Sequence, residues 1–357
     1  MTFALVYTVK NEARLLPDAI RFHKQLGCTQ FYVFFDGTTD ELPSLLDGIP
    51  ECICRNSVKP HEINDNSEWF EWTCANCDDW FDLRKQLNTY WAALHAKSLG
   101  IEWIGAIDPD ELLTPDIKHN NVSKANFEKL LSSVPTHYGQ IKFLNYDNIP
   151  VGEFAESPFV ASDLFLKRPS YLFEQAWRYS RAALGLLINN QYRRGLFKAQ
   201  YDQFVFKLLM GQAFPRTLID PILESEIPSG IYLSYYTGKT FVRTCLLEFI
   251  RPKIHFWSSL PGHRLRTTRR GAILHYDMFD FECFIHKFRQ RPSFNTVKPL
   301  YTRWAITQMA TKLSNDQARE FYLNSICIVN HQRQSFLLKR NSLVRISCAK
   351  SFFDKQI

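Results

Sequence analysis

The sequence predicts an α/β fold built on a mixed, mostly parallel sheet, and three observations support this prediction. Apolar runs of strand length alternate with segments whose apolar side chains recur at helical spacing. This strand–helix–strand order is typical of parallel strands that are covered by helices. The chain can also bury a large core, because it has 357 residues of which 45% are hydrophobic. A disordered or coiled-coil protein is therefore excluded.

Residues 3–35 give the first strand–helix–strand unit. Residues 3–10 (FALVYTVK) have the composition and length of a buried strand. The apolar side chains of residues 15–26 are spaced to lie on one face of a helix, which Gly27 can end. Residues 31–35 (FYVFF) predict a second strand, which ends in the turn-forming residues DGTTD.

The next helix and strand lead into the most distinctive motif of the chain. Apolar residues from Leu83 to Leu94 indicate a helix that stops at Gly100, and residues 103–107 (WIGAI) predict a buried strand. This strand runs directly into the sequence DPDE at residues 108–111. Beyond residue 115 the pattern is looser, and further strands and the first helix of a C-terminal part are predicted at residues 141–146, 240–244, 272–276 and 281–288.

Charge and cysteine content narrow the class of protein. The formal net charge is only +7 and no recognition motif occurs, so we expect no nucleic-acid binding. The nine cysteines are scattered, no basic leader precedes the first strand, and no apolar run has membrane-spanning length, which together predict a cytoplasmic protein. No acid occurs between Glu320 and Asp354, so this basic segment could contact an anionic membrane surface peripherally. An ordinary packed helix is the alternative.

Two carboxylates separated by one residue, Asp108 and Asp110, follow the third predicted strand. Ligands of open α/β sheets bind at the carboxyl ends of the strands. Two such carboxylates can hold a hard cation, and that cation can bridge to a diphosphate. A solvated acidic turn that caps the following helix is the alternative.

The same edge of the sheet should carry the polar residues that follow the other strands. Thr8, Lys10, Asn11 and Glu12 lie at the end of the first strand, and Asp36 follows the second. Asp36 is suited to bind the ribose or the base of a nucleotide. Asn11 and Glu12 either line the nucleotide pocket or cap the first helix.

Several short motifs occur in a fixed order along residues 1 to about 290. They are VKNE at 9–12, Leu26-Gly27, FFDGTTDE at 34–41, Arg84, Asn88, WIGAIDPDE at 103–111, GKT at 238–240 with Arg243, His255, and LHY at 274–276 before FDFECFIHKFR. This ordered set resembles the glycosyltransferases with the GT-A fold, of the family 2 and family 92 type. Residues 145–230 match no motif of that family.

The resemblance implies a metal-dependent, inverting glycosyltransferase that moves a sugar from a nucleotide-sugar donor, by analogy a UDP-sugar, to a glycan or another hydroxyl acceptor. It implies Mn²⁺ or Mg²⁺ held by Asp108 and Asp110, with His275 as a late ligand. The donor-binding residues it implies are Thr8, Lys10, Asn11, Glu12, Asp36, Arg84, Asp108 and Lys239. Without the resemblance, Arg84 is as readily a solvated residue of an amphipathic helix. His275 taken alone is more often a satisfied core histidine on a strand.

The domain organisation follows from the same resemblance. A GT-A-like domain is predicted at 1–276, with a donor-binding half at about 1–115 and an acceptor-side half at 116–276. A helical, basic C-terminal extension is predicted at 277–357.

The general base is not identified by the sequence. An inverting displacement needs a carboxylate that deprotonates the acceptor hydroxyl. In the family this base lies downstream of the paired aspartates, where this sequence departs from the pattern, and none of the acids there matches a motif: Glu153, Glu156, Asp163, Glu174 and Asp202. A non-catalytic nucleotide- or glycan-binding protein on the same fold is therefore the alternative function.

Three further groups of residues have more than one interpretation. Four thiols within 26 residues could form a zinc site, namely Cys52, Cys54, Cys74 and Cys77. The tryptophans beside them, Trp69, Trp72 and Trp80, offer a loop over the donor or a stacking surface for a sugar ring, although buried packing is commoner. The basic run at 263–270 either holds an anionic substrate or is a solvated loop.

Overall fold

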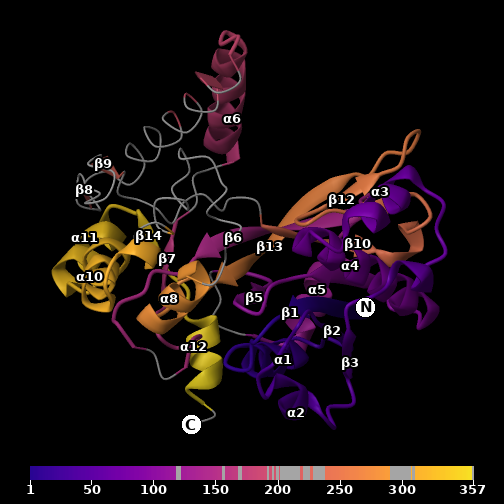
Figure 1. The fold of residues 1–357 in the computed structure, drawn as a ribbon, viewed down its shortest axis with the longest axis horizontal. Coiled ribbons are helices and arrows are strands. Elements are labelled where there is room, and N and C mark those ends of the chain that lie inside the picture. The colour runs from indigo at the N-terminus through magenta and orange to yellow at the C-terminus, as the bar shows by residue number, and fades with distance from the viewer. Residues whose placement is uncertain are drawn as a thin grey trace. The chain divides into compact units, whose positions relative to one another are not determined.

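The computed structural model (Figure 1) describes most of the chain. The described residues are 1–117, 122–154, 157–167, 171–190, 193–194, 197, 201, 218–219, 226–227, 238–289, 307 and 310–355. The chain divides into two compact units, one formed by residues 1–145 and 237–275 and the other by 146–236 and 276–355. Each unit has its own hydrophobic core. The domain boundaries expected from the sequence stay a prediction.

The first unit is built on an eight-stranded sheet with the order β3-β2-β1-β4-β10-β6-β13-β5. Its strands are β1 (Phe3–Val9), β2 (Gln30–Phe35), β3 (Cys52–Asn56), β4 (Trp103–Ala106), β5 (Glu111–Thr114), β6 (Gln140–Asp147), β10 (Lys239–Arg243) and β13 (Thr267–His275). The pairings among β3, β2, β1 and β4 are parallel, whereas β10 is antiparallel to β4 and β6, and β13 is antiparallel to β5. The predicted α/β class with a mixed sheet is confirmed.

Both faces of the parallel half are covered by helices. In β1, Ala4 and Val6 point to one face and pack in a core with α4 (Phe81–Ser98). Phe3 points to the other face, where its ring lies 4.6 Å from that of Phe127 in α5 (Lys124–Ser132). Because both faces are buried, every residue of β1 is buried, which explains its continuous apolar sequence.

The predicted helices of this unit are confirmed. Helix α1 (Leu16–Gln25) is followed by Gly27 at φ +89°, and α4 is followed by Gly100 at φ +72°, a left-handed conformation that glycine adopts without strain. The remaining elements of the unit are α2 (Leu42–Leu46), a 3₁₀ turn at Pro60–Glu62, α3 (Glu68–Asn76), a 3₁₀ turn at Thr244–Leu246, β11 (Ile250–Pro252) and β12 (Trp257–Ser259).

The second unit has an aromatic core. Phe284 lies at its centre, with ring contacts to Phe281, Phe288, Phe321 and Tyr322. Its elements are β7 (Leu164–Leu166), α6 (Tyr171–Leu186), β8 (Leu218–Ile219), β9 (Glu226–Ile227), α8 (Phe281–Arg289), α10 (Asn315–Phe321), a π-helical turn (Tyr322–Ile326), α11 (His331–Lys339), β14 (Leu343–Arg345) and α12 (Cys348–Phe353).

The basic C-terminal segment contributes to this second core. Leu337 of α11 and Leu343 of β14 are buried in it, and β14 pairs with β7. These contacts fit the packed-helix interpretation of the segment. Among the described residues, no helix combines the length and the apolar character that crossing a bilayer requires.

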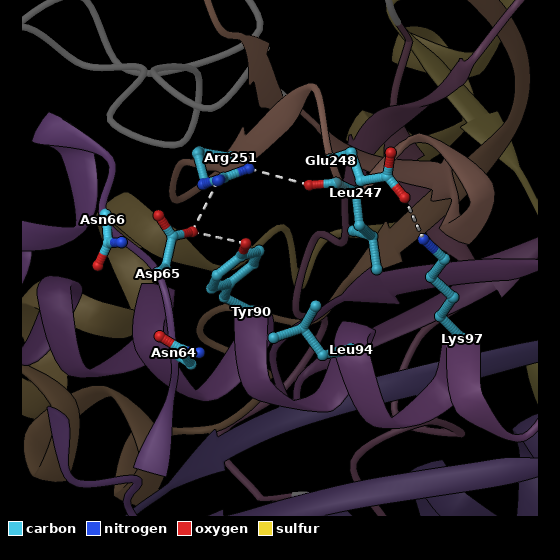
Figure 2. Close-up of a pocket in the computed structure, with 9 residues that line it drawn as sticks. All are labelled: Asn64, Asp65, Asn66, Tyr90, Leu94, Lys97, Leu247, Glu248 and Arg251. Atoms are coloured by element: carbon cyan, nitrogen blue, oxygen red, sulfur yellow. Dashed lines mark hydrogen bonds and ion pairs between the residues drawn. The ribbon is translucent and has the colours of Figure 1, made fainter. Parts of the chain in front are cut away.

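A polar recess of about 310 Å³ lies beside α4, and it is lined by none of the predicted donor or metal residues (Figure 2). Two of its lining residues, Arg251 and Asp65, form an ion pair at 2.7 Å, and the Tyr90 hydroxyl donates to Asp65 at 2.7 Å. Burial raises the pKa of Asp65, but hydrogen bonds from Tyr90 and Ser67 and the charge of Arg251 outweigh this and lower it. The recess is thus lined in part by a satisfied ion pair whose side chains are buried.

We expect Asp65→Asn to destabilise the protein by about 3 kcal/mol, because it leaves the Arg251 guanidinium buried without a counter-ion. The matched control is Glu248→Gln, which breaks the exposed Lys97–Glu248 pair at the rim and should cost less than about 1 kcal/mol. Chemical denaturation measures both. Equal losses in the two variants would contradict this account of the recess.

The same carboxylate gives a pH dependence with a definite sign. Because the pKa of Asp65 is depressed in the folded protein, Asp65 makes its full contribution to the free energy of unfolding above its unfolded pKa of about 3.9. The contribution is lost as the pH falls below that value. Comparing the free energies of unfolding of the wild type and Asp65→Asn between neutral and acid pH should show the difference shrinking only at acid pH.

Candidate functional site

The carboxyl ends of β1, β2 and β4 meet at one edge of the sheet, as the sequence predicted. The Asp36 N–H donates to the Val9 carbonyl at 2.8 Å, and the Ile107 N–H donates to the Val6 carbonyl at 3.1 Å. The Asn11 side chain then accepts from the Thr39 N–H at 2.7 Å. The three loops that carry the predicted polar residues are therefore neighbours.

Asn11 fixes the turn after β2. Its φ of 57° lies in the left-handed region, which asparagine tolerates better than most residues. Its Oδ1 accepts from the N–H groups of both Thr39 and Asp40. Glu12 begins the helix through its carbonyl, which accepts from the N–H of Leu16 at 3.0 Å. Asn11 therefore binds the turn after β2 and not the N-terminus of α1, while Glu12 contacts the start of that helix through its backbone carbonyl.

Asp36 is held by Arg84 through two hydrogen bonds of 2.8 and 2.9 Å. The Ser57 hydroxyl donates to the same carboxylate at 3.0 Å. Burial raises the pKa of Asp36, but the bonds from Arg84 and Ser57 and the charges of Arg84 and Lys10 lower it below its ordinary value. Asp36 is therefore a fixed, ionised acceptor, and exposed Lys10 acts on it through its charge.

Asn88 of α4 links the ends of two strands, β1 and β3. Its side chain is fully buried, donates to the hydroxyls of Thr8 and Ser57, and accepts from the Val58 N–H at 2.8 Å. Thr8 is thus a buried partner of α4. The sequence indicated Asn88 only as part of the family resemblance, and its contacts explain why a polar residue faces the sheet from this helix.

Asp108 lies between two lysines. Its Oδ1 pairs with Lys85 of α4 and its Oδ2 with Lys239 of β10. Burial raises the pKa of Asp108, but the charges and hydrogen bonds of Lys239 and Lys85 hold it well below its ordinary value. Lys239 was predicted to lie at the donor site, whereas Lys85 was missed. The sequence did contain a signal for Lys85, because it lies three residues before Asn88 on a helix face that is buried but polar.

Asp110 and His275 lie together, as the resemblance implied. The His275 Nε2 is 3.7 Å from the Asp110 Oδ2, and both residues are buried. The antiparallel pairing of β13 with β5 sets His275 opposite Glu111 and so brings it to the paired aspartates.

This group fits a divalent cation. Carboxylate oxygens suit Mg²⁺ and Mn²⁺, and a neutral imidazole is a common additional ligand for transition metals. Asp110 and His275 offer one ligand atom of each kind. Asp108 is not among them, because its oxygens face Lys85 and Lys239. The role of Asp108 as a metal ligand stays a prediction.

Glu111 and His23 support the loop of the paired aspartates and the strand that follows it. The Glu111 carboxylate accepts from the Asp108 N–H at 2.8 Å, and burial raises the pKa of Glu111 to about 7. Burial lowers the pKa of His23 to about 3, so its neutral ring accepts from the Leu113 N–H and donates to the Ala19 carbonyl. His23 therefore ties α1 to β5, a role that the sequence pattern does not reveal.

The structure does not identify a general base. Glu153 pairs with Arg319, and Asp163 pairs with Arg345, so these two acids take part in ion pairs within the second unit. Glu156 and Asp202 lie outside the described residues, as does the side chain of Glu174.

The zinc interpretation gains no support. Cys52 and Cys54 lie on β3, whereas Cys74 is in α3 and Cys77 follows it. Within the described ranges the four thiols form no group that could hold a metal. Of the nearby tryptophans, Trp69 packs on Tyr90, while Trp72 and Trp80 are exposed and touch edge to face.

Comparison with known proteins gives partial matches. No protein-family model matches the chain. Two Arabidopsis thaliana proteins, both named glycosyltransferase-like, are 25% identical to it over 177 and 167 residues, which are 46% and 44% of this chain. The matched regions are 38% and 32% of those proteins, so the chain spans about a third of the length of these relatives.

Solved structures also resemble the chain. One is glucosyl-3-phosphoglycerate synthase from Mycobacterium tuberculosis in complex with Mn²⁺, UDP and glucosyl-3-phosphoglycerate. It is 11% identical and has a TM-score of 0.23, over 40% of this chain and 44% of that one. Another is a mycobacterial protein that is 10% identical, with a TM-score of 0.30 over 88% of this chain and 75% of that one.

We expect Asp110→Asn to weaken Mn²⁺ binding by more than about 10-fold, because it removes a charged oxygen ligand at almost unchanged volume. Electron paramagnetic resonance of free Mn²⁺ measures this without any nucleotide. Glu248→Gln is the control, since Glu248 is an exposed acid in a different part of the unit. An Mn²⁺ affinity in Asp110→Asn equal to that of the control would show that Asp110 is no ligand.

Proposed function

We propose that the chain is a metal-dependent glycosyltransferase that moves a sugar from a nucleoside-diphosphate donor, specifically a UDP-sugar, to a glycan or another hydroxyl acceptor. The observation that carries the proposal is the Asp110–His275 pair, which offers ligands for a cation at the carboxyl edge of the sheet. The shared name of the two Arabidopsis relatives supports the same reaction class.

The chemistry explains why cationic groups belong at this edge. The departing nucleoside diphosphate gains negative charge as its bond to the sugar breaks, so stabilising that charge lowers the barrier. A Mn²⁺ or Mg²⁺ ion bound through Asp110 and His275 supplies a Lewis acid for the diphosphate. Lys239, buried at the start of β10, supplies a second positive charge nearby.

The donor would lie along the strand ends. Asp36 is ionised and immobilised by Arg84, so it is a preorganised acceptor for ribose hydroxyls or for the base. We assign donor binding to the loops that carry Thr8, Lys10, Asn11, Glu12, Asp36, Arg84, Asp108 and Lys239. Within this proposal, Asn11 and Arg84 also shape the pocket, because Asn11 holds the turn after β2 and Arg84 holds Asp36.

The remaining parts of the proposal concern the acceptor, the division of the chain and its location in the cell. An inverting displacement would require a carboxylate base, which is unassigned. We propose that residues 116–276 provide the acceptor side, residues 1–115 the donor side, and residues 277–357 a basic extension. Cytoplasmic location and peripheral membrane contact through that extension stay predictions.

The test combines ligand-dependent melting with turnover. In the wild type, UDP with Mn²⁺ should raise the melting temperature more than either alone, because a ligand that binds only the native state stabilises it. Release of UDP from UDP-sugars should then be detectable and should fall by more than about 100-fold in Asp110→Asn. Glu248→Gln serves again as the control.

The outcomes separate the two candidate functions. Metal-dependent stabilisation by UDP without transfer to any hydroxyl, water included, would favour the non-catalytic binding protein. A folded sample that no nucleoside diphosphate stabilises, with or without Mn²⁺, would refute the donor site itself.

A further inference from the structure

The two lysines at Asp108 are buried more deeply than the carboxylate they share. The side chains of Lys85 and Lys239 are 7% and 1% exposed, whereas that of Asp108 is 33% exposed. Asp108 therefore covers the ammonium groups on the side from which solvent can approach. Each ammonium faces a different oxygen of the carboxylate, so both oxygens are engaged by buried cations.

Both lysines lie at the carboxyl edge of the parallel strands. Strand β10 is antiparallel to β4, and its register pairs Phe241 with Gly105. Lys239 comes two residues before Phe241, so it lies level with Ile107, next to Asp108. Helix α4 begins at the same edge, because Arg84 in its first turn binds Asp36 at the end of β2.

Burying two ammonium groups without an anion costs several kcal/mol for each. Glu111 contributes to Lys239 at 3.6 Å, but its side chain is only 1% exposed, so it presents almost no surface to solvent. Asp108 is the anion on the outer side. Any ligand that reaches the lysines from solvent must replace Asp108 with negatively charged oxygens of its own.

We propose that Lys85 and Lys239 bind the diphosphate of the donor, and that Asp108 serves as an internal anion until the diphosphate displaces it. This rests on the donor site proposed above and adds a residue, Lys85, and an exchange step to it. A diphosphate suits the exchange because it offers several anionic oxygens to a pair of point-charge donors. Displacement frees the Asp108 carboxylate to turn toward a bound cation or a ribose hydroxyl.

The exchange predicts an unusual response to removing the acid. Because Asp108 competes with the ligand for the lysines, Asp108→Asn should bind inorganic pyrophosphate about 10-fold more tightly than the wild type in the absence of metal. If the lysines serve only to neutralise Asp108, pyrophosphate affinity should stay the same or fall. Isothermal titration calorimetry in metal-chelated buffer distinguishes these results.

Lys85 provides the complementary test. Lys85→Met should weaken metal-free pyrophosphate binding by about 10-fold or more, since a hydrogen bond to a charged group is lost. The matched control is Lys97→Met on the same helix, where the lysine is exposed and pairs with Glu248. A folded Lys85→Met protein that binds pyrophosphate as tightly as Lys97→Met would overturn the proposal.

Unbalanced charge could prevent either single variant from folding. The double variant Lys85→Met with Asp108→Asn removes one charge of each sign and leaves Lys239 beside Glu111. It should melt close to the wild type yet bind pyrophosphate at least about 10-fold more weakly than the wild type. Wild-type affinity in this folded double variant would exclude Lys85 as a phosphate ligand.

The failure of this inference is distinguishable from failure of the proposed function. Pyrophosphate binding needs neither metal nor turnover, whereas the proposed function is judged by Mn²⁺-dependent UDP binding and UDP release. If the wild type releases UDP from a UDP-sugar while all lysine variants bind pyrophosphate like the control, the exchange is wrong and the glycosyltransferase stands.

Discussion

The ion pair of Asp108 with Lys85 and Lys239 is the constraint on which the arrangement of the site depends. Two largely buried ammonium groups can exist at the end of β4 only if an anion accompanies them, because an uncompensated buried charge is strongly destabilising. Satisfying them requires α4, β4 and β10 to meet at one point. The loop of the paired aspartates is consequently held from two sides before any ligand arrives.

Helix α4 organises the rest of that edge. Within its first two turns it presents Arg84 to Asp36, Lys85 to Asp108 and Asn88 to Thr8. Each of these contacts joins the helix to the carboxyl end of a different strand. The polar side chains are therefore fixed by buried partners, which is how a binding site keeps its geometry without relying on its ligand.

The candidate cation ligands are fixed by a separate set of contacts. The pairing of β13 with β5 sets His275 beside the aspartate loop, while the neutral ring of His23 joins α1 to β5. Glu111 adds a hydrogen bond to the Asp108 N–H from within the loop. The two lysines thus contact Asp108 and His275 lies at Asp110 in the same short loop, an arrangement that suits a ligand carrying both phosphates and a metal.

The sequence by itself determined the strands at 3–10, 31–35 and 103–107, the helices at 15–26 and 83–94, and the position of the paired aspartates, because periodicity and turn residues act over a few neighbouring positions. It did not reveal β3, α2 or α3. It placed Asp36 and Asn11 at the same edge through the rule for parallel strands. It did not show Lys85 or His23 as site residues, nor which oxygens of Asp108 the lysines occupy. Those features join residues far apart in the chain, such as 85 with 108 and 108 with 239, and only the packing of α4 and the register of β10 decide them.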